Sequence, residues 1–415
     1  MKTKIISILY HPPDYEAYSQ SPRPEINWDT PNGSWVGIWG YDWPDLIGDE
    51  VLKLTSEFEY EVWQPDLRAD KVYCHTFKNG LVHKLFPAKQ KYRLYMKKYQ
   101  KVIYSKKLLE SISIEKKNFK VIININSIPL IFINLEIIKN YFRTTPITLT
   151  FHGNFTDYSK IAKKNILKYL FAIYKKSEFK KSLRMVNYIT YQNQIQKNIL
   201  SDLKTPVDKL LFLTMGVDFN FWKEDIKKNV ENNTTTFLIA SRLIPLKQID
   251  KILIIFDGLK AKYNFKLLIA GHGNEEYENY LNKLSEGLIK SDHAQFLGYK
   301  TGDEMLNLYN QADYFITVST SEGCSVSVMK AMACGVNIFS TKVGGTSDLL
   351  MKYNKGILVE PFNYDEWEEK IIKILEGNKF PMLDKRIALK HFHWPNVANE
   401  FIKIYKNLES EYEKE

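Results

Sequence analysis

Cysteine is scarce in this 415-residue chain, which contains only Cys74, Cys324 and Cys334. Their number is odd, and their spacing fits neither a disulfide framework nor a zinc site. Few thiols without a pairing pattern are typical of a reducing compartment. We therefore expect a cytoplasmic protein without a disulfide framework or a zinc site.

Long hydrophobic runs are also missing. No stretch approaches the roughly 20 uninterrupted apolar residues that a membrane-spanning helix requires. The N-terminal segment 1–13 has a basic start but only a short apolar run and no small-residue cleavage site, so it predicts a first β-strand instead of a signal peptide. The chain is 44% hydrophobic and 26% charged, as globular proteins are, and its length predicts two domains.

Acidic residues are absent from two windows of the first half. None lies between Asp70 and Glu110, where 11 Lys and Arg residues occur, and none between Asp157 and Glu178, where six lysines occur. Residues 1–222 carry a net charge of +12, whereas the remainder carries −2. Two interpretations remain: a solvated Lys-rich face, or a surface for anionic lipid headgroups or a phosphorylated acceptor. Nucleic acid is not an expected partner, because no recognition helix, zinc finger or ribonucleoprotein motif accompanies the charge.

Short apolar runs alternate with segments of helical period, a pattern typical of βαβ units and parallel sheets. In the second half the predicted strands are Thr236–Ala240, Lys266–Ala270, Ala294–Leu297, Tyr314–Val318, Val336–Ser340 and Ile357–Val359. In the first half they are Ile5–Tyr10, Tyr60–Trp63, Val121–Ile125, Ile147–Phe151, Tyr188–Thr190 and Leu210–Leu213. The predicted fold class is α/β, with two doubly wound parallel-sheet domains joined within Gly216–Glu231. Ligands of such sheets bind beyond the carboxyl ends of the strands.

Two cations follow the first predicted strand of the second domain. Arg242 and Lys247 are five residues apart, across a Pro-containing turn into a helix. They could aim two positive charges at one point, as a departing diphosphate requires, or they could belong to an ordinary solvated helix start. After the next strand, Gly271-His272-Gly273 forms either a simple tight turn or a loop that exposes backbone amides to a ligand.

The segment 318–335 contains more candidate site residues than any other segment. It ends a predicted strand, places Glu322 in a turn and begins a helix at Ser325. A carboxylate at such a turn is suited to hydrogen bonds with sugar hydroxyls. After the following strand, Gly344 and Gly345 open a helix N-terminus, whose free N–H groups and partial positive charge favour a phosphate.

In combination these segments resemble the retaining glycosyltransferases of family 4, across residues 236–360. Beside the Arg242/Lys247 pair, the matching pieces are L-L-I-A-G-H-G at 267–273, F-L-G-Y at 296–299, A-D-Y-F-I-T-V-S at 312–319, S-E-G-C-S-V-S-V-M-K-A-M-A-C-G at 321–335, K-V-G-G-T-S-D at 342–348 and G-I-L-V-E-P at 356–361. Thinner matches are F-H-G at 151–153, M-G-V-D-F-N-F-W at 215–222 and F-H-W at 392–394.

The resemblance implies a GT-B fold, in which two facing Rossmann-like domains enclose a cleft. It implies an acceptor-binding domain at 1–222, a nucleotide-sugar-binding domain at 223–390, and a C-terminal helix at 391–415 that packs back on the first domain. The implied activity is retaining transfer from a UDP- or GDP-sugar to a glycan or lipid-linked acceptor, in cell-surface polysaccharide or glycolipid synthesis, without a metal or other cofactor.

The resemblance also implies residue roles. Arg242 and Lys247 would hold the donor diphosphate, Glu322 the sugar hydroxyls, and His152 would lie near the reacting sugar. The candidate donor-binding residues are Gly271, His272, Gly273, Gly323, Cys324, Ser325, Val326, Lys330, Gly344 and Gly345. On the acceptor side the candidates are Gly37, Gly40 and Gly153.

The sequence departs from the family pattern at Lys330, where the family has a second Glu that typically holds the ribose hydroxyls. A cation can donate to hydroxyls but cannot accept from them. Three interpretations remain: a changed donor or ribose pose, a weakened transferase, or an inactive relative kept for sugar or nucleotide binding. The other retained site residues favour an active enzyme.

A second departure is the missing Gly-Gly loop after the first strand. The segment from Gly37 to Gly40 is the candidate replacement, and it lies among Trp28, Trp35, Trp39, Tyr41 and Trp43. These rings either pack beneath a long loop or form a stacking platform for an acceptor sugar.

Overall fold

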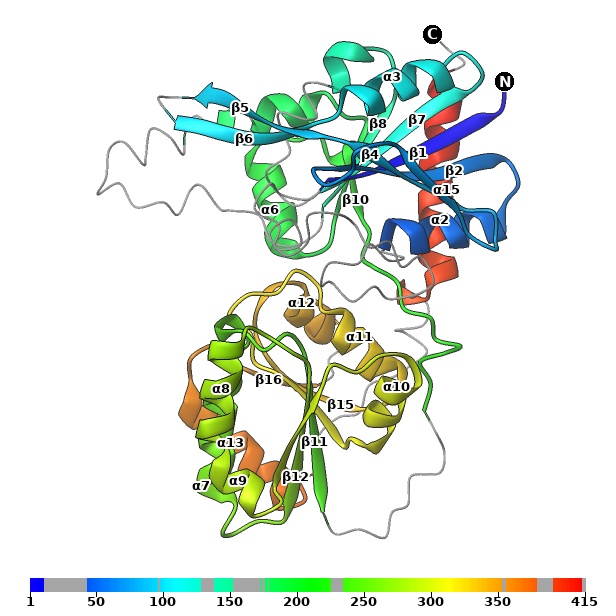
Figure 1. Cartoon of the computed structure of the whole chain (residues 1–415). Coiled ribbons are helices and arrows are strands. Elements are labelled where there is room, and N and C mark those ends of the chain that lie inside the picture. Colours follow the sequence, from blue (N-terminus) through cyan, green and yellow to red (C-terminus); the bar gives the residue numbers. More distant parts are fainter. Residues whose placement is uncertain are drawn as a thin grey trace. The chain divides into compact units, whose positions relative to one another are not determined.

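The computed structural model describes residues 1–10, 43–95, 98–127, 138–151, 173, 176–177, 179–224, 234–352, 356–378 and 391–412. The chain divides into two compact units. The first unit comprises Met1–Thr214 together with Trp394–Glu415, and the second comprises Met215–His393 (Figure 1). Each unit is built on one large sheet that is all or mostly parallel, which confirms the predicted α/β fold class.

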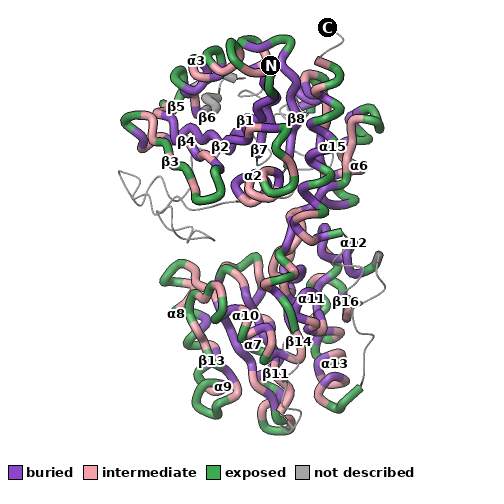
Figure 2. Tube along the Cα trace, turned by 90° about the vertical axis from the view of Figure 1, so that its right-hand side faces the viewer, coloured by how far each residue is buried: buried purple, intermediate pink, exposed green. Residues whose placement is uncertain are grey.

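The first unit contains an eight-stranded sheet in the order β10-β9-β8-β7-β1-β2-β4-β3. Its strands are β1 (Thr3–Tyr10), β2 (Phe58–Asp66), β3 (Tyr73–Thr76), β4 (Val82–Pro87), β7 (Lys120–Ser127), β8 (Ile147–Phe151), β9 (Tyr188–Tyr191) and β10 (Leu210–Phe212). All neighbours are parallel except β3 and β4, which are antiparallel. The predicted first-half strands all form, and β1 is buried along its whole length because it lies inside the sheet (Figure 2).

The helices of this unit include α2 (Trp43–Leu54), α3 (Lys106–Glu115), α6 (Gln194–Asp202) and α15 (Trp394–Tyr412). Helix α15 comes from the far end of the chain and packs against α2 and β7. The ring of Tyr405 on this helix meets that of Phe58 edge-on at 6.0 Å between centroids. The C-terminal helix is thus part of the first unit.

The acid-free window after Asp70 folds into β3, β4 and a separate antiparallel ribbon, and then enters α3. The ribbon consists of β5 (Lys89–Tyr95) and β6 (Lys98–Tyr104), and the sequence analysis did not predict these four strands (Figure 1). Strands β5 and β6 are rich in lysine and tyrosine, and β3 and β4 are short, so none of the four has the long apolar run that marks a buried strand. Lys89 and Lys91 are exposed, and Lys91 Nζ lies 3.5 Å from the ring centroid of Tyr104.

The second unit contains a six-stranded, all-parallel sheet in the order β13-β12-β11-β14-β15-β16. Its strands are β11 (Thr235–Ala240), β12 (Phe265–Ala270), β13 (Ala294–Gly298), β14 (Tyr314–Thr317), β15 (Asn337–Thr341) and β16 (Ile357–Val359). The predicted bounds agree with these to within one residue. These strands could be predicted accurately because a strand that is covered on both faces is a continuous run of apolar residues in the sequence.

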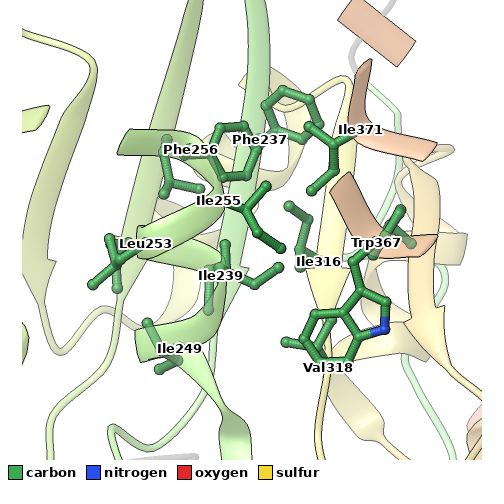
Figure 3. Packing of buried hydrophobic residues seen from close by; sticks show 14 of the residues in the cluster. Phe237, Ile239, Ile249, Leu253, Ile255, Phe256, Ile316, Val318, Trp367 and Ile371 are labelled. Atoms are coloured by element: carbon green, nitrogen blue, oxygen red, sulfur yellow. The ribbon is translucent and has the colours of Figure 1, made fainter. Parts of the chain in front are cut away.

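Helices cover both faces of this sheet: α7 (Ile249–Leu259), α8 (Glu275–Leu284), α9 (Glu286–Lys290), α10 (Gly302–Gln311), α11 (Val326–Ala333), α12 (Gly344–Lys352) and α13 (Tyr364–Leu375). On one face, Phe237 of β11, Phe256 of α7 and Trp367 of α13 belong to one buried cluster (Figure 3). On the other face, Phe315 of β14 and Met332 of α11 belong to a second.

The compact units end at slightly different residues from the predicted domains. The first break falls after Thr214 and the second after His393, instead of after residues 222 and 390. The backbone amide of Val217 donates to the carbonyl of Phe392 at 2.7 Å, and Trp222 is buried in the second unit. The segment interpreted as a linker is therefore partly core, because its apolar side chains fill one face of the second sheet.

Candidate functional site

A pocket of about 220 Å³ lies in the second unit at the carboxyl ends of β11 and β14. These strands are neighbours in the sheet and run parallel, so the loops that follow them meet at one edge. Six predicted site residues line the pocket: Arg242, Lys247, Glu322, Cys324, Ser325 and Val326.

Lys247 reaches the pocket from a single turn of 3-10 helix, Pro245–Lys247, which precedes α7. Gln248 then adopts a left-handed conformation with φ of 49°, and α7 begins at the next residue. The Lys247 ammonium donates to Oε1 of Glu322 at 2.5 Å. Both side chains are largely buried, with 16% and 12% of their surface exposed, so each charge is compensated by the other.

Glu322 is held by more than this ion pair. The hydroxyl of Ser319 also donates to Oε1 of Glu322, at 2.6 Å. One residue later, the amide of Thr320 donates to the carbonyl of Leu246 at 2.9 Å. The exits of β11 and β14 are therefore joined by backbone as well as by side chains, which fixes a cation and a carboxylate side by side.

The loop that carries Glu322 is packed against the start of α12. Gly344 has φ of +53°, and a Cβ at this position would lie 1.6 Å from the carbonyl oxygen of Glu322. The amide of Gly345 donates to the carbonyl of Gly323 at 2.7 Å. The predicted glycine pair thus allows α12 to approach the Glu322 loop more closely than any side chain would permit.

Ser325 is the N-cap residue of α11, as predicted. Its hydroxyl accepts from the amide of Val328 at 3.4 Å, and its own amide donates to the Thr346 hydroxyl at 3.3 Å. Beside it, burial and the carboxylates of Glu322 and Asp348 raise the pKa of the Cys324 thiol to about 12. This thiol remains protonated near neutral pH and is no nucleophile.

The loop Gly271–Gly273 is not among the residues that line the pocket, and its two glycines lie against backbone of the β11 exit. A Cβ on Gly271 would lie 1.8 Å from the carbonyl oxygen of Ser241, and one on Gly273 would lie 1.9 Å from that of Leu243. The two glycine amides donate within the unit, to Gly298 and Glu278. The glycines therefore allow the β12 exit to pack against the β11 exit. The His272 ring contacts Tyr299 edge-on.

Lys330 lies in α11 but does not line the pocket. Its ammonium lies over the ring of Trp222, 4.3 Å from the centroid. Burial lowers the Lys330 pKa to about 8. Among the residues that the structure describes, no carboxylate forms an ion pair with it, so an aromatic face takes the place of an anion.

His152, Gly153, Gly37 and Gly40 lie outside the described residues, as do Trp28, Trp35, Trp39 and Tyr41. Within the described part of the chain, no group of three or more His, Cys, Asp or Glu side chains could hold a metal ion. In that same part, none of the helices combines the length and the apolar character needed to span a bilayer.

Sequence reasoning missed Ser319 and Trp222 as parts of this neighbourhood. Ser319 contacts Glu322 directly, but a serine three residues before a carboxylate is too common to signal such a contact. Trp222 belongs to the predicted 215–222 motif, and only the fold brings it to Lys330.

Residues 220–388 match the family model described as glycosyl transferases group 1. An uncharacterized glycosyltransferase of Methanocaldococcus jannaschii is 26% identical over 243 residues, which cover 55% of this chain and 62% of that protein. The chain spans about half the length of several other curated relatives that it matches.

Solved structures share the fold over nearly the whole chain. Sucrose-phosphate synthase from Thermosynechococcus elongatus superposes with a TM-score of 0.67 at 12% identity, covering 99% of this chain and 100% of that one. Anabaena HepE in complex with UDP superposes with a TM-score of 0.65 at 13% identity, covering 98% and 100%. At these identities the likeness shows the fold alone, a two-domain GT-B architecture.

The close approach of α12 to the Glu322 loop can be tested with two glycine variants. Gly377→Ala introduces a side chain at φ of +82° but into open space, so it should lower the free energy of unfolding by only about 1–2 kcal/mol. Gly344→Ala also brings the new Cβ into collision with the Glu322 carbonyl oxygen. It should therefore lower the free energy of unfolding, measured by urea denaturation, clearly more than Gly377→Ala does. Equal losses in the two variants would contradict the packing described.

The burial of Lys330 predicts a pH-dependent stability difference. Because the folded-state pKa is lowered to about 8 from 10.5, the unfolded chain binds more protons between these values, and stability rises with pH there. Lys330→Met removes this penalty, so its stabilisation relative to the native chain should be largest below pH 8 and shrink towards pH 10. The exposed control Lys283→Met should show no such trend; a pH-independent difference for Lys330→Met would count against the assigned burial.

Proposed function

We propose that this chain transfers a sugar from a nucleotide-sugar donor to a glycan or lipid-linked acceptor, because residues 220–388 match the family model described as glycosyl transferases group 1. The observation that carries the proposal is the pocket that brings Arg242, Lys247 and Glu322 together at the ends of two parallel strands. Cations beside a carboxylate match a ligand that is anionic at one end and rich in hydroxyls at the other.

Arg242 and Lys247 act on the diphosphate of the donor. When the sugar–phosphate bond breaks, negative charge grows on the departing diphosphate, and fixed cations stabilise that charge most in the transition state. Arg can bind two oxygens at once, and Lys supplies a compact charge. These side chains supply the positive charge that the leaving group needs, so the proposed mechanism uses no metal ion.

Glu322 accepts hydrogen bonds from hydroxyls of the transferred sugar. It contacts Lys247, so the groups that recognise the sugar and the diphosphate adjoin each other. We propose retaining transfer: the acceptor hydroxyl attacks from the face that the diphosphate leaves, and its proton passes to the donor's own phosphate oxygen. This differs from glycosidase chemistry, which uses a pair of carboxyl groups across the bond. His152 is proposed to lie near the reacting sugar.

The donor is a UDP- or GDP-sugar, and we favour UDP because HepE, with the same fold, was solved in complex with UDP. Lys330 supports the alternative of an inactive binding protein, since it replaces the family's second Glu. The position of its ammonium over Trp222, apart from the pocket residues, leaves Arg242, Lys247 and Glu322 undisturbed and favours an active enzyme.

We further propose that the first unit contacts the anionic inner face of the cell membrane, where a lipid-linked acceptor would be found. The support is the ribbon of β5 and β6, a segment of 16 residues with six basic side chains and no acid. Each Lys or Arg near a charged bilayer contributes about 1 kcal/mol of attraction. Such contact would bring the enzyme close to lipid-linked acceptors, as synthesis of a cell-surface polysaccharide or glycolipid requires.

Arg242→Ala and Lys247→Ala should each lower turnover by a factor of about 10² to 10³, because each removes a charge that stabilises the transition state. The measurement is hydrolysis or transfer across a panel of UDP- and GDP-sugars. Lys290→Ala, at an exposed lysine in α9, is the matched control and should retain normal rates. Near-normal turnover in both pocket variants would refute the proposed role.

Flotation with vesicles tests membrane contact. The native protein should float with vesicles containing about 30% phosphatidylglycerol but not with pure phosphatidylcholine, and salt should weaken this binding. Reversing Lys89 and Lys91 to Glu should reduce binding at least about tenfold. The equal charge reversal of Lys283 and Lys290 in the second unit is the control. If the native protein stays unbound, or if the control loses as much binding, the proposal fails.

A further inference from the structure

The two oxygens of the Glu322 carboxylate are not equivalent. Oε1 accepts from the Ser319 hydroxyl at 2.6 Å and from the Lys247 ammonium at 2.5 Å. Among the described residues, Oε2 accepts no hydrogen bond. A carboxylate oxygen without a partner in a pocket is available to a ligand hydroxyl, whereas the other oxygen is already saturated by the protein.

Ser319 is held in place by burial and by hydrogen bonds of its backbone and its neighbour. It is 1% exposed, and its carbonyl accepts from the Thr341 hydroxyl of β15 at 2.7 Å. The next residue is tied to the β11 exit through the Thr320 amide. The short Ser319 side chain has one rotatable bond to the hydroxyl, so its donor is placed almost entirely by the backbone.

The second donor to Oε1 is not fixed in the same way. Lys247 has a long, flexible side chain, and under the proposed function its charge is also attracted to the donor diphosphate. When the diphosphate draws that ammonium away from Glu322, Ser319 is the donor that still orients the carboxylate. A neutral hydroxyl suits this purpose because no phosphate competes for it by charge.

We propose that Ser319 is a positioning residue that holds Oε1 of Glu322 and leaves Oε2 to accept from a hydroxyl of the donor sugar. This inference rests on the proposed function and deepens it, because it makes Ser319 a determinant of sugar recognition separate from diphosphate recognition. The substrate part concerned is a hydroxyl-bearing sugar ring, not the nucleotide.

The test measures two affinities for each variant by calorimetry. The probes are the nucleotide sugar that gives the largest thermal shift with the native protein and its own nucleoside diphosphate. Ser319→Ala should weaken binding of the nucleotide sugar about tenfold and raise its KM correspondingly, because a hydrogen bond to a charged group is lost. Affinity for the nucleoside diphosphate should not change.

Two further variants separate positioning from general damage. In a Glu322→Ala background, Ser319→Ala should add little further loss, since no carboxylate remains to be oriented. Ser285→Ala is the matched control: Ser285 is equally buried, but its hydroxyl donates to the Leu281 carbonyl away from the pocket, and both affinities should stay unchanged.

The outcomes are distinguishable. If Ser319→Ala weakens both ligands equally, if it weakens neither, or if its loss adds fully to that of Glu322→Ala, this inference is wrong while the proposed function stands. If the native protein binds and hydrolyses no nucleotide sugar in the panel, the proposed function is wrong and the inference falls with it.

Discussion

The contact between Lys247 and Glu322 is the interaction on which the candidate site depends. Lys247 follows β11 and Glu322 follows β14, two strands separated by more than 70 residues in sequence but adjacent in the sheet. Their parallel pairing brings both strand exits to one edge, where the ion pair and the Thr320–Leu246 backbone bond fasten them. A pocket at this edge follows from strand order, which is a property of the whole sheet.

Charge at this edge is tolerated because it is compensated. Removing two charges from water costs several kcal/mol unless each finds a partner, and Lys247 and Glu322 supply one another. Lys330 shows the contrasting solution: its ammonium rests on the face of Trp222, and burial depresses its pKa. Lys247 thus contacts a carboxylate in the pocket, whereas Lys330 packs against the aromatic ring of Trp222.

Glycine determines how tightly the loops of this unit can close. Gly271, Gly273 and Gly344 each lie where a Cβ would overlap a carbonyl oxygen of a neighbouring loop. From the sequence, the glycine pair Gly344–Gly345 suggested a phosphate site; in the fold, all three glycines allow close approach of backbone to backbone. The resulting rigidity supports the site, because the residues that would act on a donor are carried by these loops.

Prediction from sequence succeeded where the chain's environment was uniform. The strands of the second unit are covered on both faces, so their apolar runs identified them nearly residue by residue. In the first unit, β3, β4, β5 and β6 were missed, because β3 and β4 are short and β5 and β6 are rich in lysine and tyrosine, so none shows that pattern. The compact units break after Thr214 and His393, because the segment 215–222, which resembles a connection in the sequence, contributes Trp222 to the core of the second unit.

The sequence by itself determined the α/β class, the order of the second-unit elements and the residue types at each strand exit, because these depend on local periodicity and short motifs. Only the tertiary structure decided which exits meet. It placed Ser319 and Lys247 on the same oxygen of Glu322, turned Lys330 towards Trp222, and closed the glycine loop against Ser241 and Leu243. The reason is that strand adjacency and loop packing arise from contacts between residues far apart in the chain, which no local pattern encodes.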